Sequence, residues 1–191
     1  MHKTRLEAFS DGVLAIIITI MVLELRPPHG AAFGDLRPLL SSFLGYGLSF
    51  LMLGIYWNNH HHLFQAVQKV NGLILWANMH LLLWLSLIPF VTAWMAENHF
   101  APRPVALYGG VLWMAGMAYY LLVRALLRHH GAASTLAKAI GSDFKGKISL
   151  VIYTGAIALA FSSPLAAILL FVAVAFIWIV PDLRIEKTLE P

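Results

Sequence analysis

Hydrogen-bonding and ionisable side chains lie at one end of several apolar segments in this 191-residue chain. Ser10 and Asp11 stand near the start of the first such segment, which runs RLEAFSDGVLAIIITIMVLEL from Arg5 to Leu25. A carboxylate in an apolar helix is costly, so it normally faces protein or water and has a partner. Asp11 therefore marks either a polar network that holds helices together or a titratable functional group.

Partners for Asp11 are available in the next two apolar segments. The second segment ends in Trp57, Asn58 and the histidines 60–62, and the third carries Asn78 and His80 near its start. In antiparallel membrane helices, which rise 1.5 Å per residue, these groups share one depth with Asp11. We predict a structural polar network of Ser10, Asp11, Trp57, Asn58, His61 and His80. The alternative is a proton relay or pH sensor that uses Asp11 and the histidines.

A metal centre or enzyme site finds little support in the residue spacing. Consecutive histidines point in three directions on a helix, so His60, His61 and His62 cannot converge on one ion. The chain has no HExxH sequence, no GxSxG, no P-loop and no GxGxxG motif. It also has no cysteine, and hence no thiolate ligand or nucleophile. We expect no enzyme activity, no metal centre, no cofactor and no small-molecule substrate.

The first segment has two different sides when it is placed on a helix. At about 100° per residue, one face roughly 120° wide collects Phe9, Gly12, Val13, Ile16, Thr19, Ile20 and Leu23. Asp11 falls nearly opposite, and Thr19 is the only hydroxyl on that face. The face could line a pore or pack on neighbouring helices. Periodicity alone favours packing, because apolar stripes are usually packing faces.

The composition requires a membrane for these helices. The chain is 60% hydrophobic and only 12% charged, which is typical of an integral membrane protein. Six apolar segments are each close to the length that spans the hydrocarbon core. They cover approximately residues 7–25, 37–59, 72–95, 104–127, 144–161 and 164–180. We predict one all-α domain, residues 1–191, with six transmembrane helices, and a short surface helix at 134–140 in the longest connection.

The orientation follows from the distribution of lysine and arginine. With a cytoplasmic N-terminus, only Arg26, Arg37 and Arg103 of the 13 basic residues lie outside. The cytoplasmic side would hold Lys3, Arg5, Lys69, Arg124, Arg128, Lys138, Lys145, Lys147, Arg184 and Lys187. Such a bias places both termini in the cytoplasm. The basic residues are dispersed over connecting segments, which argues against a nucleic-acid partner.

Several short patterns resemble one known family. Arg5-x₃-Phe9-Ser10-Asp11 followed by an Ile/Thr/Leu-rich helix is similar to the signature of the transmembrane protein 175 family. Tyr56-Trp57-x₂-His60-His61-x₂-Phe64 and Pro89-Phe90-x-Thr92 resemble its other recurring stretches. The resemblance covers all six segments and is strongest from Arg5 to Thr92.

The resemblance implies a function as well as a fold. It implies a potassium-selective channel without a carbonyl filter loop, of the prokaryotic kind, assembled as a homotetramer in the bacterial plasma membrane. Ile16, Thr19 and Leu23, with Ile20 facing the same way, match the positions of the pore constriction in the first helix. The resemblance thus favours the pore interpretation of the apolar stripe. It also implies polar contacts for Arg5, Ser10 and Asp11, which adds Arg5 to the predicted polar network. Potassium would be the permeant ion, and the lipid bilayer and further copies of the chain the partners.

Two other classes of function remain open at this point. One is a proton-conducting or proton-coupled membrane protein that uses Asp11 and the histidine cluster; steep pH dependence of flux would favour it. The other is a non-conducting membrane scaffold, which absence of any ion flux from the purified protein would favour.

Overall fold

A computed structural model describes residues 3–67, 69–131, 134, 136–137 and 143–179. The elements in these ranges are all helices. In chain order they are α1 (Thr4–Leu23), the 3₁₀ helix η1 (Phe33–Leu39), α2 (Leu40–Gln65), α3 (Gly72–Ser86), α4 (Ile88–Glu97), α5 (Pro102–His130), α7 (Phe144–Ala160) and α8 (Pro164–Ile179). The all-helical class predicted from the apolar segments is therefore confirmed.

Four stretches are long and apolar enough to cross a membrane. They are Thr4–Leu23, Phe33–Gln65, Gly72–Glu97 and Pro102–His130. Helices α7 and α8 coincide with the last two predicted spans but contain only 17 and 16 residues. The six-span count therefore stays a prediction, as does the cytoplasmic location of both termini. The predicted surface helix at 134–140 lies largely outside the described residues.

The third predicted span is not one continuous helix. The chain forms α3 and α4 with a break at Leu87. Pro89 in the first turn of α4 has no N–H group, and its ring would clash with the carbonyl group four residues earlier in a continuous helix. The predicted span 72–95 falls within Gly72–Glu97, which is long and apolar enough to cross a membrane. The break inside it was not predicted, and Pro89 was the available signal.

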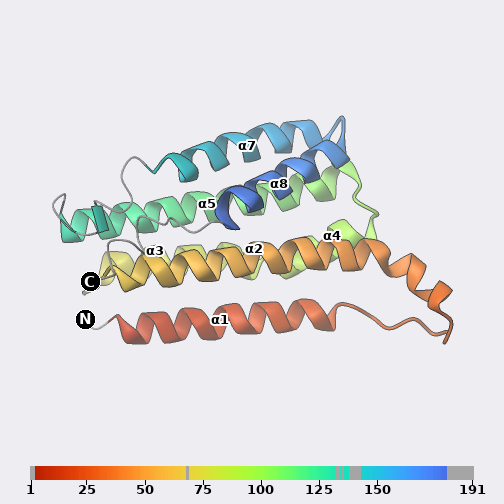
Figure 1. Ribbon diagram of the computed structural model, residues 1–191, viewed down its shortest axis with the longest axis horizontal. Helices are drawn as coiled ribbons and strands as arrows, with labels where there is room; N and C mark the ends of the chain where they lie inside the picture. The colour runs from red at the N-terminus through yellow and green to blue at the C-terminus, as the bar shows by residue number, and fades with distance from the viewer. Residues whose placement is uncertain (1–2, 68, 132–133, 135, 138–142, 180–191) are drawn as a thin grey trace.

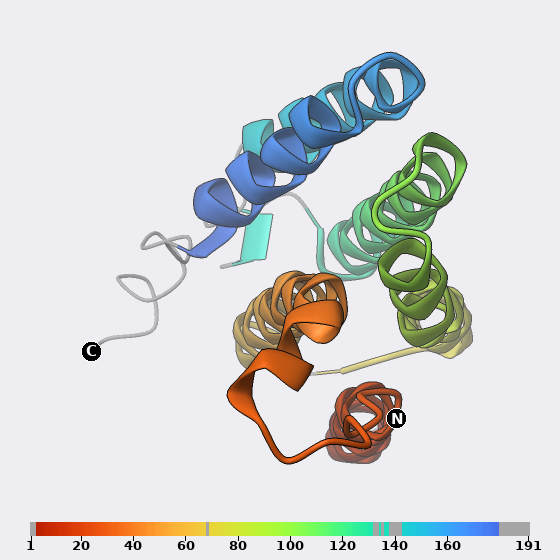
Figure 2. The same cartoon turned by 90° about the vertical axis from the view of Figure 1, so that its right-hand side faces the viewer.

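The helices lie roughly parallel to the long axis of the molecule (Figure 1). Helix α1 forms one edge of the bundle, and the α7–α8 pair forms the opposite edge (Figure 2). Helices α2, α3, α4 and α5 lie between these edges. The start of α1 and the ends of α2 and α5 lie at one end of the bundle, which we call the basic end because it holds Lys3, Lys69 and Arg128.

Close packing in the α5–α7–α8 part depends on a small residue. A Cβ atom at Gly109 of α5 would lie 2.7 Å from Phe171 Cζ of α8 and 3.0 Å from Ile157 of α7. Tyr108 and Phe171 beside it are fully buried, with ring centroids 5.6 Å apart. Glycine at position 109 therefore lets α5 approach both neighbouring helices.

Candidate pore face and polar network

Helix α1 buries one face and exposes another. Its buried residues are Leu6, Ser10, Leu14, Ile17 and Met21. The stripe singled out in the sequence lies on the exposed side, where Ile16, Ile20 and Leu23 are 59%, 43% and 77% exposed. An isolated subunit thus leaves a row of large aliphatic side chains partly exposed, which predicts contact with lipid, an ion path or another subunit.

Thr19 lies on the same exposed face. Its hydroxyl group donates a hydrogen bond to the Ile16 carbonyl oxygen of its own helix, at 2.8 Å. Because the threonine proton is used within α1, the hydroxyl oxygen is left as an acceptor on the exposed face. A groove of about 500 Å³ runs beside the stripe, between Ile16 and Ile20 of α1 and Pro89 and Phe90 of α4.

The buried side of α1 makes one polar connection through α3 to α2. Asn78 Nδ2 donates to Ser10 Oγ at 2.9 Å, and Asn78 Oδ1 lies 2.8 Å from His60 Nε2. An amide oxygen only accepts, so His60 Nε2 carries the proton and donates. Ser10 in turn donates to the Leu6 carbonyl oxygen at 2.8 Å. The three side chains are buried and link three helices.

Asp11 uses a different partner. Trp57 Nε1 of α2 donates to Asp11 Oδ1 at 3.0 Å, in an exposed position. The Trp57 ring stacks on His61 with centroids 6.0 Å apart, and His61 Nε2 lies 2.8 Å from Gln65 Nε2. Asp11 is therefore held at the surface where α1 meets α2, off the aliphatic stripe.

The other predicted network members lie apart from these two groups. Trp84 Nε1 donates to His80 Nε2 within α3, at 2.9 Å. In the part of the chain that the structure describes, neither Arg5 nor Asn58 forms a side-chain hydrogen bond or ion pair. We expected one network because these residues lie at the same depth in the membrane. The structure instead has separate hydrogen-bonded pairs and one series of hydrogen bonds, Ser10–Asn78–His60, that links three helices.

The predicted polar network left out the two central residues of the hydrogen-bonded series Ser10–Asn78–His60. His60 and Asn78 carry the buried connection, whereas His61 and His80 were singled out. The signal was present in Asn78, because an amide in an otherwise apolar helix requires a partner. The choice between adjacent histidines depends on how α2 is rotated against α3, which spacing alone does not give.

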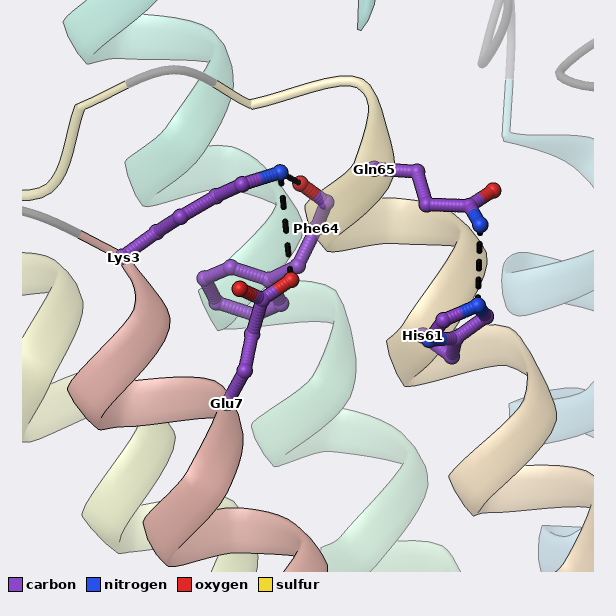
Figure 3. A network of polar contacts seen from close by, with 5 residues as sticks. All are labelled: Lys3, Glu7, His61, Phe64 and Gln65. Atoms are coloured by element: carbon purple, nitrogen blue, oxygen red, sulfur yellow. Dashed lines mark hydrogen bonds and ion pairs between the residues drawn. The ribbon is translucent and has the colours of Figure 1, made fainter.

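Lys3, directly before α1, forms a further polar link between α1 and α2. Lys3 Nζ donates to the Phe64 carbonyl oxygen at the end of α2 and lies 3.8 Å from Glu7 Oε1 (Figure 3). Carbonyl groups at a helix end lack partners within the helix, so a lysine there is favourable. The link joins α1 and α2 at the basic end.

A cluster of three hydroxyl groups lies between α2, α4 and α5. Ser49 Oγ lies 2.7 Å from Thr92 Oγ1 and 3.0 Å from Tyr108 Oη. Thr92 donates to the Ile88 carbonyl oxygen at 2.7 Å. Ser49 therefore donates to Thr92 and accepts from Tyr108. This cluster holds α4, just beyond the break at Leu87, against the centre of the bundle.

A bundle of long apolar helices with an exposed aliphatic stripe defines the class of a multi-pass membrane protein. Comparison with known proteins gives the family. A family model described as "Endosomal/lysosomal potassium channel TMEM175" matches residues 5–89. A protein named potassium channel from Chryseobacterium sp. (strain P1-3) is 56% identical over 190 residues, which is 100% of this chain and 99% of the relative. The chain belongs to the TMEM175 family, an ion-channel family and not an enzyme family.

A solved structure agrees over nearly the whole chain. The crystal structure described as a lysosomal potassium-selective channel TMEM175 homolog from Chamaesiphon minutus superposes with a TM-score of 0.81. It is 28% identical and covers 94% of this chain and 97% of its own. The TMEM175 protein of Gallus gallus, named an endosomal/lysosomal proton channel, is 30% identical over 54% of this chain and 23% of its own length.

Proposed function

We propose that this chain is the subunit of a potassium-selective channel in which the first helix of each copy lines the ion path. The observation that carries the proposal is the exposed stripe of Ile16, Ile20 and Leu23 on a helix whose other face is buried. Membership of the TMEM175 family and the potassium channel named in Chryseobacterium support it.

The stripe explains how such a channel restricts ions without a carbonyl filter. Bulky aliphatic side chains leave no room for a hydrated ion and offer no replacement ligands, so the barrier is desolvation. Ile16 and Leu23 lie about 10 Å apart along α1, which makes a long dry neck. Thr19 would add hydroxyl oxygens within this neck. Potassium sheds water more cheaply than the smaller sodium ion, so a tight apolar neck penalises sodium more.

One α1 per chain cannot surround an ion path, so the proposal requires several copies around an axis. We propose a homotetramer in the bacterial plasma membrane with both chain termini in the cytoplasm. Potassium is the permeant ion, and no resident cofactor is required. Native mass measurement of the detergent-solubilised protein should give four subunits, and a stable monomer in lipid would contradict the channel.

The sharpest test replaces one residue of the stripe. Ile16→Asn places an amide in each copy of the neck, wets it and lowers the desolvation barrier. We expect a higher ion flux and a reversal potential shifted toward zero under potassium/sodium bi-ionic conditions, measured in planar bilayers. Unchanged conductance together with unchanged reversal potential would remove Ile16 from the constriction.

Val22→Asn is the matched control. Val22 is 46% exposed, similar to the stripe residues, but lies about 120° from the centre of the stripe on the helix. This variant should keep the selectivity of the unmodified channel. Leu14 and Ile17 are less useful controls because both are buried and their replacement by asparagine would disturb folding.

A proton-conducting protein is the second candidate. The Gallus gallus relative is named a proton channel, and the buried chain from Ser10 through Asn78 to His60 offers exchangeable protons. Liposome flux measured with a pH gradient and no potassium gradient separates the two candidates. A proton current that His60→Gln abolishes would favour the second one.

A further inference from the structure

A cavity of about 40 Å³ lies among α2, α5, α7 and α8, away from α1. Figure 2 shows α7 and α8 on the side of the bundle opposite to α1. Aliphatic side chains and the rings of Tyr56, Tyr119, Tyr153 and Trp178 form its walls. The cavity is therefore separate from the proposed ion path.

Three of the tyrosines that line this cavity, Tyr56, Tyr120 and Tyr153, form no hydrogen bond through the hydroxyl group within the described residues. Tyr153 is 3% exposed, and in the described ranges neither its hydroxyl group nor that of Tyr56 forms a hydrogen bond. By contrast, Tyr119 Oη donates to the Asn59 carbonyl oxygen at 3.2 Å and Trp178 Nε1 donates to Ser149 Oγ at 2.8 Å. Buried polar groups in proteins nearly always have a partner, so unpaired hydroxyl groups in one cavity indicate an occupant.

The mouth of the cavity lies at helix ends. Asp143 and Gly146 at the start of α7, with Trp178 in the last turn of α8, line the cavity. Lys145 and Lys147 stand in the first turn of α7 beside them. Lysine and tryptophan at the ends of membrane helices belong to the headgroup region of the bilayer. On this basis we expect the end of the cavity at Asp143, Gly146 and Trp178, which we call its mouth, to lie toward the headgroup region, near a carboxylate and ammonium groups.

The size of the cavity limits what can enter it. About 40 Å³ corresponds to roughly three water-sized spheres at 10–15 Å³ each. An aminoethyl group, with one nitrogen and two carbon atoms, fits that space, whereas a choline group with six non-hydrogen atoms does not. A primary ammonium group has only donors, which the phenol oxygens of Tyr56 and Tyr153 can accept, and aromatic faces attract cations. The phosphate group that follows would lie at the mouth near basic residues.

We propose that this cavity binds the headgroup of an ethanolamine phospholipid from the membrane leaflet at the basic end. The ammonium group enters between Tyr56 and Tyr153, and the phosphate group stays at the mouth beside the first turn of α7. The lipid would lie on the α7–α8 side of each subunit, opposite to α1, whether or not the subunit conducts.

The test measures lipid retention by native mass spectrometry. The full-length protein is equilibrated in detergent micelles that contain equal amounts of phosphatidylethanolamine, phosphatidylcholine and phosphatidylglycerol. We expect preferential retention of phosphatidylethanolamine. In the double variant Tyr56→Phe with Tyr153→Phe, this preference should fall at least about tenfold, because hydrogen bonds to a charged group are lost. Tyr46→Phe, which removes a hydroxyl group elsewhere on α2, is the matched control and should keep the preference.

Three results would overturn the proposal. The first is equal retention of the three lipids by the unmodified protein, as expected if water alone fills the cavity. The second is an unchanged preference in the double variant with a normal melting temperature. The third is stabilisation by free phosphoethanolamine without retention of the lipid, which would assign the site to a soluble ligand. Competition of phosphoethanolamine against retained lipid would support the same headgroup chemistry.

Discussion

Helices α1 and α5 are both long and apolar enough to span a membrane, but they have very different surroundings. Five of the 20 residues of α1 are buried, whereas α5 buries thirteen of 29 and contacts helices on several sides. Composition therefore does not distinguish a helix that completes the subunit core from one that presents an apolar face to something else. The difference lies in what each helix packs against, and in the isolated subunit it leaves an exposed apolar face on α1.

Glycine replacement should give the largest difference between the two regions. Gly109→Ala places a Cβ atom 2.7 Å from the buried Phe171 ring, and overpacking of this kind costs roughly 1–3 kcal/mol of the free energy of unfolding. Gly12→Ala on α1 meets nothing within 4 Å, and should change stability by less than about 1 kcal/mol. Thermal unfolding in detergent measures both. Equal destabilisation would mean that α1 is as tightly packed as α5.

The buried link from α1 through Asn78 should have the next largest effect. Asn78→Leu leaves the donor of His60 without an acceptor, at a cost of about 1–2 kcal/mol in a membrane protein. Asn58→Leu is the matched control, since Asn58 makes no side-chain hydrogen bond in the described part of the chain. Unfolding in mixed detergent micelles should separate the two variants, and equal stabilities would show that the link contributes nothing.

The exposed pair of Trp57 and Asp11 should contribute less than the buried link. Trp57→Phe removes the indole donor while keeping an aromatic ring, and we expect a loss of about 0.5 kcal/mol because the pair is exposed to solvent. Trp76→Phe, at a residue that is 76% exposed and makes no side-chain hydrogen bond in the described structure, should have no effect. A loss above about 2 kcal/mol would show that Asp11 is covered by another subunit in the assembly.

The smallest expected effect concerns the ion pair at the start of α1. Glu7→Gln removes the charge that faces Lys3 at 3.8 Å, and a partly exposed pair four residues apart contributes about 0.3–0.5 kcal/mol. The loss should disappear in high salt, because salt screens surface charges. Unfolding measured at low and high salt concentrations checks this, and a salt-independent loss would contradict the assignment.

Much of this fold could be predicted from apolar runs, but its side-chain contacts could not. The helical segments and the apolar stripe on α1 follow from residue periodicity alone, because burial and helix geometry act locally. The break between α3 and α4 at Leu87 was not predicted, although Pro89 favours a helix break at this place. The buried chain through His60 depends on the relative rotation of α2 and α3, which is set by packing over the whole bundle. The sequence of one subunit does not give the contacts of the stripe of Ile16 and Leu23, because they depend on what surrounds the subunit.

The polar links of α1 to other helices have a mechanical consequence. Lys3, Ser10 and Asp11 make all of these links within the described residues. Lys3 directly precedes α1, and Ser10 and Asp11 lie in its first half. From Ile16 to Leu23, dispersion contacts alone hold α1 to its subunit, and these weaken gradually as surfaces slide. Helix α1 is therefore fixed by polar contacts at its N-terminal end only, so a small tilt of the helix about that end moves Leu23 further than Ile16.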